Sequence, residues 1–243
     1  MKSKTILFGV ILTVLFSFNV FSQSADEIIS KYTDAIGGKA NWDAVKSMKV
    51  TGYMNIMNMD IPYTQYVKRQ GLWLVEVQVQ GMKIIQAYDG ASGWMINPMM
   101  GSKKPEKTDE ETTKTYKANT LIGGKLLNVK EMEYAVELVG TEQVDGKEVF
   151  NIKLTDKDGK VSNYYIETST FLIYKSTSSF IRSGSEFTSE TVFSNYTKVN
   201  DILIPFIQDQ RLGGAQTSNQ MITVDKIEIN AKIDDKIFVM PAE

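Results

Sequence analysis

Apolar and polar side chains alternate with a period of two along most of this 243-residue chain, which is the pattern of half-buried β-strands. The alternation begins at Val50, fails after Pro98, and returns from about Tyr134 to Ile229. A chain with this pattern must bury one face of a sheet, so its fold class is mainly β.

The spacing of the runs predicts how the strands are connected. Asp145-Gly146 and Asp158-Gly159 each separate two alternating runs, and Asp-Gly pairs favour tight hairpin turns. About a dozen strand candidates follow one another at hairpin spacing, and helical segments do not alternate with them. The sequence therefore predicts an antiparallel meander rather than a parallel α/β fold.

Helical patterns occur only before the first strand and in the middle of the chain. Ser24 and Glu27 have the spacing of a capping box, apolar residues follow at helical intervals, and Gly37-Gly38 ends the helix. A second short helix is expected over 41–47, and a third helical region over 109–127. A curved antiparallel sheet forming an open half-barrel, with these N-terminal and central helices covering its concave face, accommodates this order, whereas a closed barrel would leave the helices only its mouth.

The N-terminus has the order of a secretory signal. Lys2 and Lys4 precede an apolar run over 6–21, and Val20 and Ser22 stand at the −3 and −1 positions of a cut after Ser22. The run is shorter than the ~20 residues of a spanning helix, which argues against a retained anchor, and no cysteine follows it to carry a lipid. We predict a signal peptide over 1–22 and a single exported, soluble domain over 23–243.

The chain contains neither histidine nor cysteine. Ser-His-Asp and Cys-His nucleophile systems therefore cannot be built, and the usual neutral-pH base is missing. Zinc, copper and non-haem iron sites are disfavoured because they rely on imidazole or thiolate ligands. We expect no metal, no cofactor and no catalytic residue, which leaves binding as the leading interpretation and a carboxylate-dependent hydrolase as the remaining enzymatic alternative.

The charge balance excludes two classes of partner. Without the two lysines of the signal segment, 25 basic residues stand against 29 acidic ones. A nucleic-acid binder would show a basic stripe, and an electrostatic membrane anchor would show a basic cluster. Neither is expected here.

Two motifs and the C-terminal ending carry a resemblance to a known family. Arg69 closes a strand with an aromatic residue, Trp73, shortly after it. The next motif, Asp-Gly-x-x-x-Trp-x-x-x-Pro, is formed by Asp89, Gly90, Trp94 and Pro98, and the stretch 234–241 ends in Phe-x-x-Pro. These residues resemble the LolA/LolB-like superfamily of periplasmic outer-membrane lipoprotein-sorting carriers, although Gln70 stands where that family usually has proline.

The resemblance implies a fold and a role. The fold is a half-barrel whose apolar cavity shields acyl chains, each methylene of which costs ~0.8 kcal/mol in water. The implied cargo is an acylated lipoprotein or another lipid, and the implied partners are an inner-membrane release complex and an outer-membrane acceptor. The chain is then a periplasmic monomer of a Gram-negative bacterium, with Arg69 as a gate residue that bonds to the backbone of a lid over 109–127. An ordinary surface pair is the alternative for Arg69.

Methionines and tryptophans are the candidate lining of such a cavity. Seven of the twelve methionines fall between residues 54 and 100, and flexible thioethers recur on surfaces that accept varied apolar ligands. Met54, Met82, Met95, Trp73 and Trp94 are the predicted cavity residues. For all five the alternative is an ordinary core position.

Three function classes follow. The first is a non-catalytic carrier of acylated lipoproteins or other lipids. The second is a periplasmic binding or sensor module that holds one small apolar ligand in the same cavity. The third, the carboxylate-dependent hydrolase, has no distinguishing motif among the 29 acidic residues.

Overall fold

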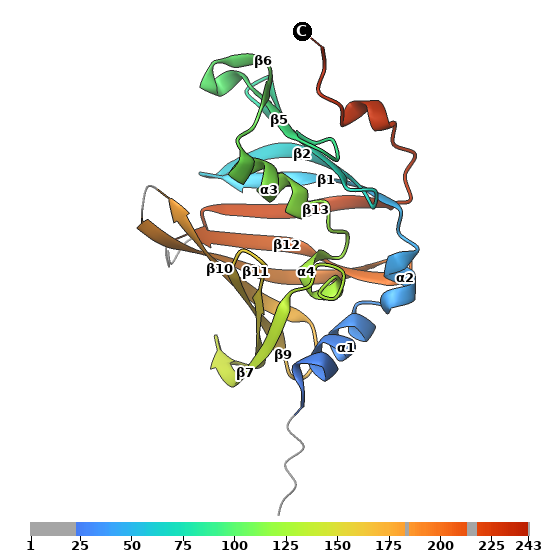
Figure 1. The fold of residues 1–243 in the computed structure, drawn as a ribbon, viewed down its shortest axis with the longest axis vertical. Coiled ribbons are helices and arrows are strands. Elements are labelled where there is room, and N and C mark those ends of the chain that lie inside the picture. Colours follow the sequence, from blue (N-terminus) through green and yellow to red (C-terminus); the bar gives the residue numbers. More distant parts are fainter. Residues whose placement is uncertain (1–22, 183–184, 213–217, 243) are drawn as a thin grey trace, which may run out of the picture.

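A computed structural model describes residues 23–182, 185–212 and 218–242. The predicted signal segment, 1–22, lies outside the described residues. Within them the chain forms one antiparallel sheet with helices packed against it (Figure 1).

The sheet has 13 strands in the order β6-β5-β4-β3-β2-β1-β13-β12-β11-β10-β9-β8-β7. Each strand pairs with its sequence neighbour except at β1–β13, so the sheet is two meanders joined at that pair. The strands are β1 (Ser47–Ile56), β2 (Met59–Lys68), β3 (Leu72–Val79), β4 (Met82–Tyr88), β5 (Gly93–Asn97), β6 (Ser102–Lys107), β7 (Ala135–Val144), β8 (Lys147–Thr155), β9 (Val161–Glu167), β10 (Ile173–Arg182), β11 (Ser185–Val199), β12 (Ile202–Leu212) and β13 (Gln220–Ile229).

The sheet is open, because β6 and β7 form its two edges and do not pair with each other. Irregular pairing helps to bend it. In β1, Thr51 pairs with Lys226 and Gly52 with Val224, so Asp225 is an extra residue on β13. Such bulges increase the local twist. Gly52 is required there because a Cβ would collide with the carbonyl oxygen of Thr223.

The helices lie where the sequence predicts helical segments, with shifted bounds. They are α1 (Ala25–Ala35), α2 (Lys39–Asp43), α3 (Glu110–Ala118) and α4 (Gly124–Leu127), with 3-10 turns at η1 (Pro98–Met100) and η2 (Asp235–Ile237). The capping box of α1 is formed as predicted: Glu27 N donates to Ser24 Oγ, and Ser24 N donates to a carboxylate oxygen of Glu27.

Three expectations about element bounds need correction. The second helix spans 39–43 rather than 41–47, since Ser47 already pairs with Lys68 in the sheet. The polar stretch after residue 102 contains an edge strand, β6, whose mostly exposed positions show no apolar alternation. The helical region over 109–127 is two short helices separated by Gly123, which has a positive φ of 82°.

The chain between β6 and β7 must cross the sheet, because these strands are its opposite edges. That crossing segment contains α3 and α4, and Figure 1 shows both helices in front of the strands, with α1 and α2 along one end of them. The predicted half-barrel with helices over its concave face is therefore confirmed.

The buried side chains form two clusters on opposite faces of the sheet. The larger cluster joins α1, α2 and the crossing segment to the concave face, and it includes Trp73. Its neighbour in β3, Leu74, belongs to the smaller cluster, as strand alternation requires. That convex-side cluster is completed by the C-terminal segment, whose Phe238 is fully buried.

Candidate functional site: an inner hollow under the crossing segment

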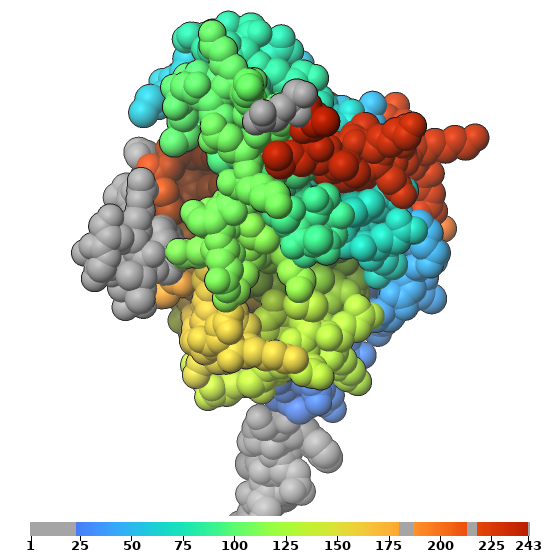
Figure 2. Space-filling model, turned by 45° about the horizontal axis from the view of Figure 1, so that its top comes forward, coloured from blue at the N-terminus to red at the C-terminus, as the bar shows by residue number. Residues whose placement is uncertain are grey.

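A hollow of about 600 Å³ lies between the concave face and the helices. Its walls come from β1–β4, β9–β13, α1, α2 and the crossing segment. In the space-filling view, the green α3 segment lies across this face, and a recess beside it opens onto the orange strands (Figure 2). We call this space the inner hollow. Its volume is within the range of pockets that bury a small organic ligand.

Aliphatic and aromatic side chains make up most of the lining. Met48 and Val50 of β1 face the hollow beside Val67 of β2, and Ile122 and Leu126 face it from the crossing segment. Such a surface gains free energy when an apolar ligand displaces water from it, at roughly 25 cal/mol per Å².

Four of the five predicted cavity residues lie on the concave face. Met54 and Trp73 line the hollow directly. Met82 and Met95 do not belong to its lining, but the register places them on the same face. Met82 pairs with Val79, two residues beyond Val77 of the inner cluster, and Met95 pairs with Gln86, which lines the hollow. Residues that pair directly across strands project from the same face.

Trp94 lies on the other side of the sheet, so its predicted place in the cavity needs correction. It pairs with Ala87 and packs against Phe238, and its indole Nε1 donates to the carbonyl oxygen of Phe238 at 2.7 Å. The tryptophan of the Asp-Gly-x-x-x-Trp motif and the phenylalanine of the C-terminal ending thus contact each other. Trp94 is 1% exposed, so it occupies an ordinary core position, which was the alternative to a place in the cavity.

Asp89 and Gly90, which precede Trp94, form a tight turn. Asp89 Oδ1 accepts the N–H groups of Ala91 and Ser92 at 2.9 and 2.7 Å, and Gly90 has a φ of 98°. Burial acts to raise the pKa of Asp89, but these hydrogen bonds to its charged form outweigh burial and lower it. The carboxylate is a structural acceptor.

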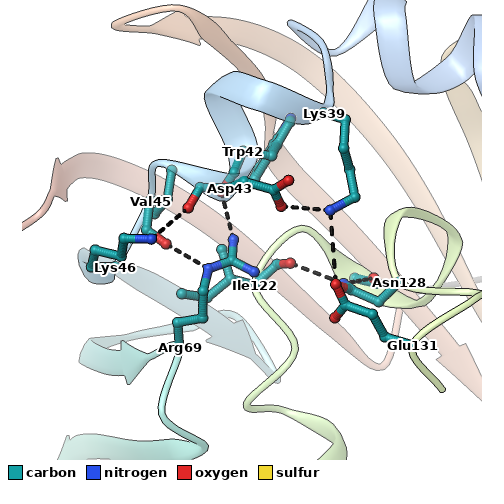
Figure 3. Close-up of polar contacts among 10 residues, drawn as sticks. Lys39, Trp42, Asp43, Val45, Lys46, Arg69, Ile122, Asn128 and Glu131 are labelled. Atoms are coloured by element: carbon teal, nitrogen blue, oxygen red, sulfur yellow. Dashed lines mark hydrogen bonds and ion pairs between the residues drawn. The ribbon is translucent and has the colours of Figure 1, made fainter.

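Arg69 joins the β2–β3 turn to the end of α2 (Figure 3). Its Nε donates to the carbonyl oxygen of Val45 at 2.8 Å, and one terminal nitrogen donates to that of Trp42 at 2.5 Å. The sequence prediction had Arg69 bonding to the backbone of the 109–127 segment. Its partners are instead the carbonyl oxygens of Trp42, near the C-terminal end of α2, and of Val45, two residues beyond that helix.

Trp42 connects these bonds to the crossing segment. Its indole Nε1 donates to the carbonyl oxygen of Ile36, and its ring packs so closely on Gly123 that a Cβ there would lie 3.1 Å from Trp42 Cε3. Lys39 adds a second connection, because its Nζ pairs with Asp43 of α2 and lies 3.8 Å from Glu131 beyond α4 (Figure 3). Arg69 therefore reaches the crossing segment through Trp42.

Sequence reasoning missed a set of polar side chains in the lining. Five glutamines face the inner hollow: Gln65, Gln86, Gln208, Gln210 and Gln220. The residues that pair directly with each glutamine on the neighbouring strands also face inward. The strand register, once known, therefore shows that the glutamines face inward. In the sequence they resemble the polar half of the alternation and cannot be distinguished from solvent-facing residues.

The hydroxyl groups in the lining are neutral, and one lining residue, Lys125, is charged. Burial raises the pKa of Tyr32, Tyr164 and Tyr196 above the ordinary tyrosine range. Burial, followed by the nearby Lys160, lowers the pKa of Lys125. Its Nζ donates to Ser162 Oγ at 3.2 Å and lies over the Tyr134 ring, so this ammonium group is already engaged.

A second groove of about 850 Å³ lies near the β2–β3 turn. It is lined by basic residues, among them Lys46, Lys68 and Lys232, together with Arg69 and Asp234. Lys68 already pairs with Asp235, and Arg69 is held by α2. The inner hollow is the candidate site because it is the more enclosed and the more extensively lined of the two.

Among the residues that the structure describes, no group of three or more acidic side chains is placed to hold a metal ion. No helix in that part of the chain is long and apolar enough to cross a membrane.

Comparisons with known proteins agree on the fold. Neither a protein-family model nor a curated protein matches the sequence. A LolA superfamily protein from Nitrosomonas europaea matches over 90% of this chain and 98% of its own, with a TM-score of 0.58 and 14% identity. A domain named for outer membrane lipoprotein sorting, from Vibrio parahaemolyticus, matches over 87% of this chain and 94% of its own, with a TM-score of 0.55 and 13% identity.

A DUF1329 family protein from Desulfovibrio piger is similar to the same degree, with a TM-score of 0.58, 15% identity, and coverage of 90% of this chain and 98% of that one. At these identities the likeness establishes a shared fold. The resemblance that the sequence motifs carry is thereby confirmed at the level of the fold.

Proposed function

We propose that this chain is a non-catalytic carrier that shields acyl chains of lipoproteins or other lipids in its inner hollow. The single observation that supports this most is the hollow itself. It is about 600 Å³ in volume, lined mainly by apolar side chains, and covered by a segment that is attached to the sheet at both ends.

The physical need for such a hollow follows from the cargo. A 16-carbon chain in water costs on the order of 10 kcal/mol, at ~0.8 kcal/mol per methylene. Hydrogen bonds cannot offset this cost, whereas burial against an apolar lining can. Met54 is suited to the task because its flexible thioether can adapt to chains of different shape.

Entry and exit of a chain need a cover that moves. In this proposal α2 and the crossing segment are that cover, and Arg69 is the gate residue. Its two bonds to Val45 and Trp42 hold α2 against the β2–β3 turn, and Trp42 holds Gly123 in turn. A ligand that pushes Trp42 outward strains these contacts and opens the hollow further.

The proposed carrier acts in the periplasm together with two partners. The predicted signal over 1–22 exports the chain to a Gram-negative periplasm, where it acts as a monomer. An inner-membrane release complex supplies the cargo and an outer-membrane acceptor removes it. The shared fold with a lipoprotein-sorting domain supports these partners by analogy.

A fluorescent fatty-acid probe tests the proposal. Met48→Gln places an amide in the apolar part of the lining and should lower the affinity for the probe about tenfold. Met221→Gln is the matched control, because Met221 belongs to the adjacent strand but pairs with Asn55 and so projects from the opposite face. Equal binding by both variants and the unchanged protein would remove the inner hollow as the site.

The alternative, a binding or sensor module for one small apolar ligand, uses the same hollow. The five glutamines favour it, because polar groups at fixed positions select among ligands. The binding affinities of fatty acids with 8 to 18 carbons distinguish a carrier from a sensor. A carrier binds more tightly as the chain lengthens, whereas a sensor shows one sharp optimum.

A further inference from the structure

The polar side chains of the inner hollow are arranged in a continuous band. Gln220 of β13 pairs with Gln210 of β12, which pairs with Thr191 of β11. Thr191 pairs with Ser176 of β10, and Ser176 pairs with Tyr164 of β9. Direct cross-strand partners project from one face, so five neighbouring strands carry uncharged hydrogen-bonding groups in a row on the concave side.

The two glutamines of this band lie at one end of the hollow. Gln210 is near the end of β12 and Gln220 begins β13. The other end of β12 lies against α1, where Leu203 N donates to the carbonyl oxygen of Ile36. The lining near α1 consists of aliphatic side chains and three tyrosines, Tyr32, Tyr164 and Tyr196, and the Tyr196 hydroxyl already donates to the carbonyl oxygen of Ile173. The glutamine side chains of β12 and β13 therefore lie at the end of the hollow away from α1.

The opposite wall contributes two further glutamines. Gln65 and Gln86 both pair with Val75 of β3, so they share one face of the sheet. Trp73 lies nearer the α2 end, because it pairs with Val67, which pairs with Met48 at the start of β1. Its indole Nε1 is buried and, within the described residues, has no hydrogen-bond partner, so it does not belong to the glutamine end.

These glutamines have few bonds within the protein. In the part of the chain that the structure describes, Gln220 Nε2 has a weak contact with Met54 Sδ at 3.3 Å, and the side chains of Gln65, Gln86, Gln208 and Gln210 make no hydrogen bond. A purely hydrocarbon ligand would strip water from them without replacing it, which is costly. A ligand with its own carbonyl and hydroxyl groups would satisfy them.

We propose that the inner hollow selects amphiphiles whose head group is uncharged and carries ester, amide or hydroxyl groups. The acyl tail lies toward α1, and the head lies along Gln208, Gln210 and Gln220. An anionic head is disfavoured because Lys125, the one charged residue in the lining, is already bonded to Ser162. This inference rests on the proposed function and names its ligand class.

The test compares three 12-carbon ligands that differ only in the head: 1-monolauroylglycerol, laurate and dodecane. Each displaces a fluorescent acyl probe from residues 23–243, the protein without the predicted signal segment. The unchanged protein should prefer monolauroylglycerol to both others by about tenfold, the equivalent of one or two net hydrogen bonds.

Two variants test which side chains produce the preference for monolauroylglycerol. Gln210→Leu combined with Gln220→Leu should remove most of it while leaving dodecane displacement unchanged. Gln208→Leu removes the third amide of the proposed head-group site, and should weaken monolauroylglycerol about fivefold and leave dodecane unaffected. Gln78→Leu is the control, because Gln78 is exposed and pairs with Lys83 on the other face. Circular dichroism of each variant establishes that it is folded.

The outcomes separate this inference from the proposed function. Equal displacement by dodecane and monolauroylglycerol overturns the head-group selection and leaves acyl binding intact. A preference for laurate overturns it as well. If the probe does not bind the unchanged protein at all, the proposed function fails, and the selection of a head group fails with it.

Discussion

At the scale of single residues, Arg69 is the side chain whose removal should change both stability and ligand exit. Its guanidinium holds two carbonyl groups at the end of α2. Arg69→Met keeps most of the side-chain volume and removes both bonds, so it should lower the free energy of unfolding by about 2 kcal/mol. It should also speed the exit of a bound acyl probe, because α2 is no longer held to the β2–β3 turn.

Lys46→Met is the matched control for this change. Lys46 is also a cation beside α2, but its Nζ makes one exposed bond, to the carbonyl oxygen of Asp43. Hydrogen exchange should rise over 39–45 in Arg69→Met and stay unchanged in Lys46→Met. Unaltered exchange and probe exit in Arg69→Met would leave Arg69 as an ordinary strand-end residue.

Asp89 gives a pH-dependent prediction at the same scale. The pKa of its carboxyl group is lowered on folding, so its charge adds stability that is present above about pH 4 and is lost as the pH falls through the folded-state pKa. Asp89→Asn keeps a side-chain oxygen but removes the charge. The variant should be about 1 kcal/mol less stable at pH 7.

Urea unfolding at several pH values measures this effect. The gap between the variant and the unchanged protein should close as the pH falls from 5 to below 3. A gap of constant size over this range would mean that the charge of Asp89 contributes nothing to the turn.

At the scale of elements, the C-terminal segment packs against the convex side of the sheet and does not line the inner hollow. Phe238 is fully buried in the convex-side cluster, and its carbonyl oxygen accepts from Trp94. Phe238→Ala should cost about 3–5 kcal/mol of stability through the cavity it leaves. Probe affinity should be unchanged in the folded fraction, because the inner hollow is on the other face.

Ile237→Ala serves as the control, since Ile237 is the preceding residue and is 37% exposed. It should cost less than about 1 kcal/mol. Thermal unfolding and probe titration at a temperature where both variants are folded measure the two quantities. A loss of probe affinity in folded Phe238→Ala would link the convex side to the site.

Elements with a strong local signal were predictable from the sequence, and elements set by pairing were not. The capping box of Ser24 and Glu27 identified α1, because its hydrogen bonds are local. Strand β6 was missed because its sequence, Ser-Lys-Lys-Pro-Glu-Lys, contains no apolar residue, and its pairing with β5 forms it at an exposed edge. The split between α3 and α4 depends on Gly123, whose close contact with Trp42 is a tertiary feature.

At the scale of the whole molecule, the open half-barrel was predictable because alternation and helix placement both constrain it. The site was predictable only in part. Met54 and Trp73 line the hollow, but Trp94 has the same residue type as Trp73 and lies on the convex side. An odd or even position within a strand selects the face, and single-sequence patterns rarely fix that register. The inward glutamines were missed for the same reason.

The central claim is that the inner hollow takes up an acyl chain, and photo-crosslinking tests it most directly. The protein without the predicted signal segment, residues 23–243, is incubated with a fatty acid that carries a diazirine in its tail, illuminated, digested and mapped by mass spectrometry. We predict label on residues from both walls of the hollow near α1 and α2, including Val50, Leu203 and Ile122, and its loss when excess unlabelled fatty acid is present. Label confined to outward-facing residues such as Met221, or label that excess fatty acid does not displace, would contradict the account.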